Sequence, residues 1–86
     1  MVTGSVEQSR LIVKNLPAKF TEEKLRELFR KFGIITDASL KYTTSGKFRR
    51  FAFVGFVDES CCLQAISKLN NTFVQGLKIS VKSSIY

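Results

Sequence analysis

The sequence has 86 residues, of which 44% are hydrophobic and 24% are charged, with five Gly and one Pro. This composition predicts one folded domain, and a chain of this size leaves little room for a deep catalytic cleft. Fourteen Lys and Arg against seven Asp and Glu give a net charge of +7, which favours an anionic partner such as nucleic acid or an acidic membrane surface. The longest apolar run, Phe51 to Val57, is far too short to cross a bilayer, and we expect no membrane partner.

The first part of the chain predicts a lead, a strand and a helix. Residues 1–9 lack apolar periodicity, and we expect a flexible lead before a domain at residues 10–86. The β-rich run from Leu11 to Leu16, stopped by Pro17, predicts the first strand. Thr21 is the expected N-cap of the first helix and Gly33 its C-cap. Its buried stripe is expected to comprise Leu25, Leu28, Phe29 and Phe32.

The middle of the chain predicts a hairpin. Apolar and polar residues alternate toward the end of the segment from about Ile34 to Tyr42, which predicts the second strand. Residues 43–47 are rich in turn formers, and the run from Phe48 to Val57 is dense in Phe and Val, so it predicts the third strand.

A second helix and a last strand complete the prediction. Asp58 is the expected cap of the helix, which Asn70 and Asn71 close. The inner stripe of this helix is expected to comprise Cys62, Ala65, Ile66 and Leu69. After a loop through Gly76, the alternation from Lys78 to Lys82 predicts the fourth strand.

The order strand, helix, strand, strand, helix, strand predicts an α+β, ferredoxin-like split βαβ fold. Right-handed crossovers then place both helices on one face of a four-stranded antiparallel sheet and leave the other face bare. Strand parity predicts an inward set of Leu11, Val13, Ala38, Leu40, Ala52, Val54, Phe56, Ile79 and Val81. The same parity puts Arg49, Phe51, Phe53 and Gly55 on the bare face.

Two aromatic residues on the bare face are the main functional signal. No third layer of this short chain covers Phe51 and Phe53, so we expect both rings to stand exposed in a binding surface. The cations expected around them are Lys14, Lys41, Lys47, Arg49, Arg50, Lys78 and Lys82, whereas most acids fall on the helices. Rings among cations suit single-stranded nucleic acid, because bases stack on the rings and the cations neutralise phosphates. The alternative is that a C-terminal segment or a partner domain covers the rings as core.

Catalysis, metals and cofactors have little support in the sequence. The chain has no His, and Cys61 and Cys62 are adjacent, a spacing that suits neither a disulfide loop nor a zinc site. We interpret both cysteines as small apolar residues, the alternative being a vicinal redox pair. Small acyl-phosphate hydrolases share the ferredoxin-like architecture, but Asn15 is followed by Leu and Pro rather than by a Gly-rich phosphate loop. We therefore expect no enzyme activity, no cofactor and no metal.

Two segments resemble the signature of the RNA recognition motif, and the resemblance covers Arg10 to about Ser83. Residues 49–56, Arg-Arg-Phe-Ala-Phe-Val-Gly-Phe, are similar to the octamer of that family, and residues 11–16, Leu-Ile-Val-Lys-Asn-Leu, to its hexamer. The resemblance implies that Phe51 and Phe53 contact bases or sugars and that Arg49 pairs with a phosphate. Ile12 stands where the hexamer is usually aromatic and offers only apolar contact. Arg50 stands where the octamer usually has Gly.

A narrower resemblance is to the first such domain of the nucleolar multiple-RNA-binding-domain proteins. It extends over residues 9–17, 35–37 and 46–56. This resemblance implies a monomeric module of a longer nuclear, nucleolar protein that processes precursor ribosomal RNA. An alternative function is protein binding by the same fold, although the retained rings and the balanced charges of the first helix favour RNA.

Overall fold

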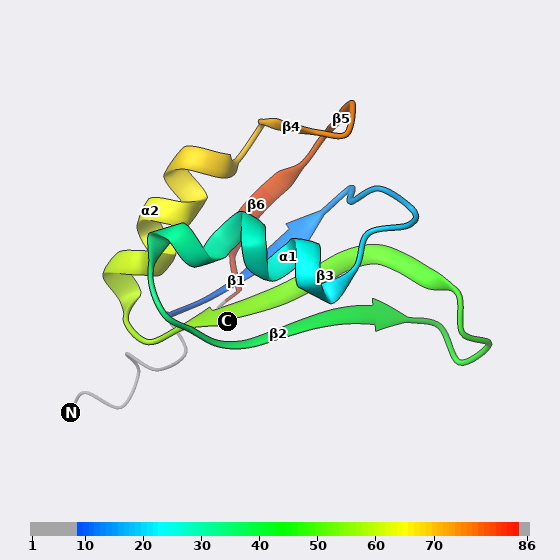
Figure 1. The fold of residues 1–86 in the computed structure, drawn as a ribbon, viewed down its shortest axis with the longest axis horizontal. Coiled ribbons are helices and arrows are strands. Elements are labelled where there is room, and N and C mark those ends of the chain that lie inside the picture. Colours follow the sequence, from blue (N-terminus) through cyan, green and yellow to red (C-terminus); the bar gives the residue numbers. More distant parts are fainter. Residues whose placement is uncertain (1–8, 85–86) are drawn as a thin grey trace.

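The computed structural model describes residues 9–84, and its elements follow the predicted order (Figure 1). They are β1 Arg10–Lys14, α1 Glu22–Phe29, the 3₁₀ turn η3 Arg30–Phe32, β2 Ile35–Tyr42, β3 Phe48–Phe56, α2 Glu59–Leu69, β4 Phe73–Val74, β5 Leu77–Lys78 and β6 Ser80–Ser83. The predicted lead lies outside the described residues except for Ser9, which is buried.

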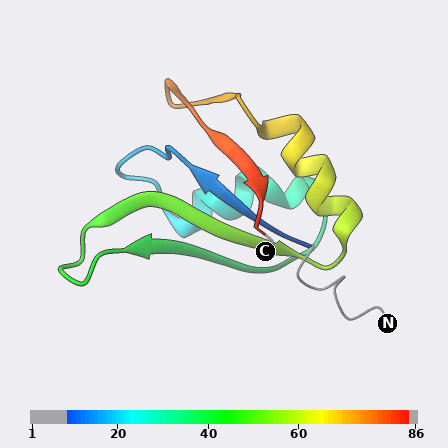
Figure 2. The same cartoon turned by 180° about the vertical axis from the view of Figure 1, so that it is seen from behind.

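A four-stranded antiparallel sheet is the centre of the fold, with strand order β2-β3-β1-β6. Both helices lie on one side of this sheet, in front of it in Figure 1 and behind it in Figure 2. The other side carries no helix. The ferredoxin-like fold predicted from the element order is therefore confirmed.

Both helices begin at the residues predicted to cap them. The Lys24 backbone N–H donates to Thr21 Oγ1 at 3.2 Å, and the Cys61 backbone N–H donates to Asp58 Oδ1 at 3.0 Å. Each bond satisfies one of the N–H groups that a helix start leaves without an intrahelical partner. Within residues 9–84, neither helix is long and apolar enough to span a membrane.

The core lies between the helices and the inner face of the sheet. Of the nine residues predicted to point inward, eight are buried and Leu40 is half-buried against the others. The helices add Leu25 and Phe29 from α1 and Cys62, Ala65 and Leu69 from α2. Phe29 and Phe56 pack edge to face, with ring centroids 6.4 Å apart. The buried apolar area of this layer is the main stabilising contribution.

The first helix ends earlier than its apolar stripe predicts. The α-helical hydrogen bonds stop at Phe29, and one 3₁₀ turn carries the chain to Phe32. Arg30, and not Gly33 as predicted, is the C-cap of α1, whereas Gly33 ends the 3₁₀ turn. The Gly33 backbone passes directly against Cys61 of α2. A Cβ atom on Gly33 would collide with the Cys61 side chain, so glycine is required by close approach.

The last predicted strand is divided in two. Leu77 and Lys78 leave the main sheet and pair with Phe73 and Val74 in a separate hairpin, and only Ser80–Ser83 joins the sheet as β6. The prediction of one continuous strand from Lys78 was wrong because the chain turns back at Gln75 and Gly76, both with positive φ.

Arg50 occupies a bulge in β3 with a left-handed backbone. The β2–β3 register shifts between Leu40 and Tyr42, and the φ angle of Arg50 is 63°. Its carbonyl accepts from the Leu16 N–H at 3.0 Å, and its Nε donates back to the Leu16 carbonyl at 2.8 Å. These two bonds hold an arginine in a conformation that glycine adopts without steric cost.

This geometry predicts an order of stability for two variants. Arg50→Ala keeps the left-handed strain but loses the Nε bond to Leu16, and we expect it to be less stable than the wild type by about 1 kcal/mol. Arg50→Gly loses the same bond but relieves the strain. We therefore expect its free energy of unfolding to exceed that of Arg50→Ala by about 1 kcal/mol. Urea unfolding measures both, and equal stability of the two variants would contradict the strained conformation.

The cap of α2 predicts a pH dependence. The Cys61 backbone N–H, aided by the Cys61 thiol, holds the pKa of Asp58 below its ordinary value of 3.8. A lowered pKa in the folded state means that this stabilisation is complete above the unfolded pKa and is lost as the pH falls through the folded pKa. We therefore expect the free energy of unfolding of the wild type to fall relative to that of Asp58→Asn as the pH falls below about 4. Thermal melts across this range measure it; a constant difference would contradict the titrating cap.

Candidate nucleic-acid interface

Side chains on the bare face of the sheet form cross-strand rows, because the central strands pair in register. Ile12 of β1 lies opposite Phe53 of β3 on one side and opposite Lys82 of β6 on the other. In the next row, Lys14 lies opposite Phe51. The two central strands, β1 and β3, thus place the rings in the middle of the face.

The two rings contact each other on this face. Phe51 and Phe53 pack edge to face, with centroids 5.9 Å apart and planes at 85°. Neither ring belongs to the core beneath the helices, so among the described residues the alternative of a buried aromatic pair is not observed. Both residues are half-buried rather than exposed as predicted, because each ring shields the other and a cation lies over each.

Each ring has its own cation. Lys41 Nζ lies 5.4 Å from the centroid of Phe53, and Arg49 Cζ lies 5.0 Å from that of Phe51. These distances are within the range of a favourable cation–π interaction. The positive charges are therefore held beside the surfaces on which a planar ligand would stack.

An ion pair closes one end of the face. Arg10 and Asp37 flank Gly55 in the register, and Arg10 Nη1 donates to Asp37 Oδ2 at 2.8 Å across it. A Cβ atom on Gly55 would lie 2.8 Å from Thr36 Oγ1 and 3.4 Å from Arg10 Nη1 and Asp37 Oδ1, so the missing side chain gives the pair its place. This pair was not predicted from the sequence, although the glycine at an outward strand position was a signal for it.

Of the predicted site residues, some lie together on the bare face of the sheet and others do not. The face brings together Ile12, Lys14, Lys41, Arg49, Phe51, Phe53 and Lys82. Lys47 is exposed in the connection between β2 and β3, and Arg50 is anchored by its Nε to Leu16. Lys78 lies in the β4–β5 hairpin rather than on a strand of the main sheet.

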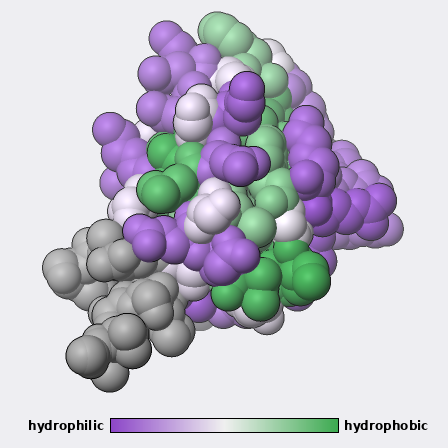
Figure 3. All heavy atoms as spheres, turned by 90° about the vertical axis from the view of Figure 1, so that its left-hand side faces the viewer, coloured by the Kyte–Doolittle hydropathy of each residue, from purple (hydrophilic) through white to green (hydrophobic). Residues whose placement is uncertain are grey.

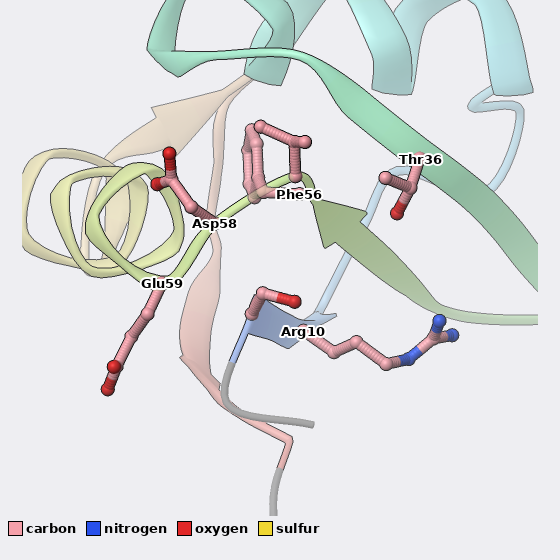
Figure 4. Close-up of a pocket in the computed structure, with 7 residues that line it drawn as sticks. Arg10, Thr36, Phe56, Asp58 and Glu59 are labelled. Atoms are coloured by element: carbon pink, nitrogen blue, oxygen red, sulfur yellow. The ribbon is translucent and has the colours of Figure 1, made fainter. Parts of the chain in front are cut away.

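The end of the molecule that carries the Arg10–Asp37 pair also has exposed apolar surface. Figure 3 shows hydrophobic atoms exposed there between larger hydrophilic areas. Two exposed apolar residues adjoin each other, since the Val57 N–H donates to the Ile34 carbonyl at 2.9 Å. A pocket lies near Val57, but the carboxylates of Asp58 and Glu59 on its wall point in different directions and Arg10 extends away from both (Figure 4). The lining of this pocket therefore does not bring an acid, a base and a nucleophile together.

The cysteines have no reactive environment. Both are free thiols, Cys62 buried and Cys61 half-buried. Burial raises the pKa of Cys62 to about 11, and the hydrogen bond to Asp58 raises the pKa of Cys61. Both shifts oppose thiolate formation, which agrees with the interpretation as apolar residues. Within residues 9–84, no group of three His, Cys, Asp or Glu side chains could hold a metal ion.

Comparison with known proteins assigns a family to this geometry. The family described as "RNA recognition motif" matches residues 11–80. The human protein named "Probable RNA-binding protein 19" is 49% identical over 74 residues, which are 86% of this chain and 8% of that protein. "Multiple RNA-binding domain-containing protein 1" of Candida albicans is 43% identical over 74 residues, 86% of this chain and 9% of that protein. The chain thus spans less than a tenth of these curated relatives.

Solved structures agree. The Sex-lethal RNA recognition domains 1 and 2 from Drosophila melanogaster are 30% identical with a TM-score of 0.85, over 91% of this chain and 50% of that chain. A structure described as a Sxl-lethal protein/RNA complex is 31% identical with a TM-score of 0.85, over 93% of this chain and 50% of that one. With its two helices, its four-stranded sheet and its matching residues 11–80, the chain belongs to the RNA recognition motif family.

Proposed function

We propose that this domain binds single-stranded RNA on the bare face of its sheet. The observation that carries the proposal is the pair of rings, Phe51 and Phe53, each on the open face and each with a cation, Arg49 or Lys41, within cation–π distance. Family membership and the likeness to a protein/RNA complex support the same function.

The arrangement favours single strands over duplexes. A base can stack on a ring only when its own face is free, and a duplex covers that face with the neighbouring base pairs. The cations beside the rings are placed to meet the phosphates of a strand whose bases lie on Phe51 and Phe53. Lys14 and Lys82 extend this positive charge across β1 and β6.

The position of Ile12 limits the strength of binding. It lies beside Phe53 in the middle row, where an aromatic residue would supply a third stacking surface. An isoleucine side chain there covers a base or sugar with apolar surface but cannot stack as a ring does. We therefore expect weaker and less sequence-selective binding than a domain with three rings would give.

The relatives support a wider role in a larger protein. Proteins named for multiple RNA-binding domains are more than 40% identical over this domain, which is a small fraction of their length. We infer that the domain acts as a monomeric module of such a protein, in the nucleus and the nucleolus, on precursor ribosomal RNA. Several modest modules in tandem gain affinity through effective concentration, which suits a domain with two rings.

The first test removes the rings. Phe51→Ala and Phe53→Ala should each weaken binding to a randomised single-stranded RNA pool by roughly 1 to 3 kcal/mol, because a stacked base loses its partner. Fluorescence anisotropy measures the affinity. Leu63→Ala, an exposed apolar residue on α2, is the matched control and should bind as the wild type does. Wild-type affinity of both ring variants would refute the proposal, provided that circular dichroism shows them folded.

The second test measures the salt dependence of binding. Removing a cation that meets a phosphate, by Lys41→Ala or Arg49→Ala, should reduce the slope of log affinity against log salt by about 0.7. Lys68→Ala removes the same charge from α2 on the other side of the domain and should leave the slope unchanged. If all three variants lower the slope equally, the attraction belongs to the net charge and not to the ring face.

A further inference from the structure

The β4–β5 hairpin presents an aromatic side chain to solvent. Phe73 is 68% exposed, although it lies in a short paired strand, and Lys78 is its cross-strand partner. Cross-strand partners in an antiparallel pair project from the same face. The hairpin therefore repeats, at a smaller scale, the combination of a ring and a cation found on the sheet.

The ring and the lysine face away from the helices. Val74 packs against the core, so its neighbour Phe73 projects from the opposite side of the hairpin. Ile79, which joins β5 to β6, is buried, so Lys78 and Ser80 on either side of it share the outward parity. Ser80 lies opposite Lys14 in the main sheet. Phe73 and Lys78 thus continue the side of the molecule that carries the RNA-binding face.

A direct bond ties the hairpin to the sheet at this point. Asn15, which follows Lys14 at the end of β1, donates from Nδ2 to the Lys78 carbonyl at 2.8 Å. Figure 2 shows the β4–β5 hairpin, in orange, beside the loop that leaves β1. A strand of RNA that passes Lys14 therefore meets the hairpin next.

The charges favour RNA that leaves the sheet toward the β4–β5 hairpin over RNA that leaves it toward the Arg10–Asp37 pair. At the far end of the sheet, Arg10 is neutralised by Asp37. At the near end, Lys14, Arg49 and Lys78 are exposed, and no carboxylate of the described residues forms a salt bridge with any of them. A polyanion on the face is drawn toward the unneutralised end.

We propose that Phe73 and Lys78 form an additional nucleotide site, in which a base of the RNA strand leaving the sheet stacks on Phe73 and its phosphate meets Lys78. The site rests on the proposed function, since it binds the same strand as the rings of β3. Its occupant is single-stranded RNA, because the surface joins the ring face and has the same chemistry.

RNA length separates this site from the ring face. We would compare randomised single-stranded pools of about four and about ten nucleotides, the shorter one sufficient for the sheet only. Phe73→Ala should weaken binding of the longer pool by roughly five- to a hundredfold and leave the shorter pool unchanged, as expected for one stacked base. Phe73→Tyr keeps a ring and should retain the affinity for the longer pool. Lys78→Ala should lower the salt slope for the longer pool alone, by about 0.7.

The outcomes are distinct from those that test the ring face. If Phe73→Ala leaves the longer pool unaffected while Phe51→Ala weakens it, the additional site is wrong and the proposed function stands. An equal loss for both pools would also overturn the site, because it would indicate a structural effect; the 68% exposure of Phe73 argues against one. Loss of binding in Leu63→Ala, the exposed apolar control on α2, would point to the same structural cause. If neither Phe51→Ala nor Phe53→Ala weakens the binding of either pool, the proposed function itself fails.

Discussion

The alternation of side chains along β3 is the constraint on which the rest of the domain depends. Helices cover only one side of the sheet, so each β3 residue that enters the core fixes its neighbour on the open side. Ala52 and Val54 are fully buried, and this burial forces Phe51 and Phe53 outward. The burial that stabilises the fold thus also orients the stacking surface. A shift of the β3 register by one residue would exchange the two faces of the strand, so the core and the stacking surface would be lost together.

A separation of charge follows the separation of layers. The helices carry Glu22, Glu23 and Glu59 in their first turns, where the helix dipole favours acids. The open face carries cations, and its acid, Asp37, is paired with Arg10 at one end. Because these carboxylates lie at helix starts and not on the sheet, the electrostatic attraction for a polyanion is concentrated on the side that has the rings.

Features governed by local rules could be predicted from the sequence, and features governed by distant register could not. Thr21 and Asp58 cap their helices as their types and positions indicate. Period-two alternation identified the inward residues of β1, β2 and β3, although it assigned Lys78 to the main sheet, which β5 does not join. The Arg10–Asp37 pair joins residues 27 apart in the sequence and requires the exact alignment of three strands. The left-handed Arg50 is stabilised by Leu16, 34 residues away. The β4 and β5 strands are two residues long, too short for periodicity to reveal them.

The contact between Gly33 and Cys61 has a practical consequence for work on this protein. Cys61 Sγ lies against the Gly33 backbone, where there is no space for even a methyl group. A dye or spin label attached to Cys61 would therefore push η3 away from α2. Its neighbour Cys62 is enclosed by the core. Probes for measuring distances would therefore be introduced at engineered thiols on exposed residues, after both native cysteines have been replaced by alanine or serine.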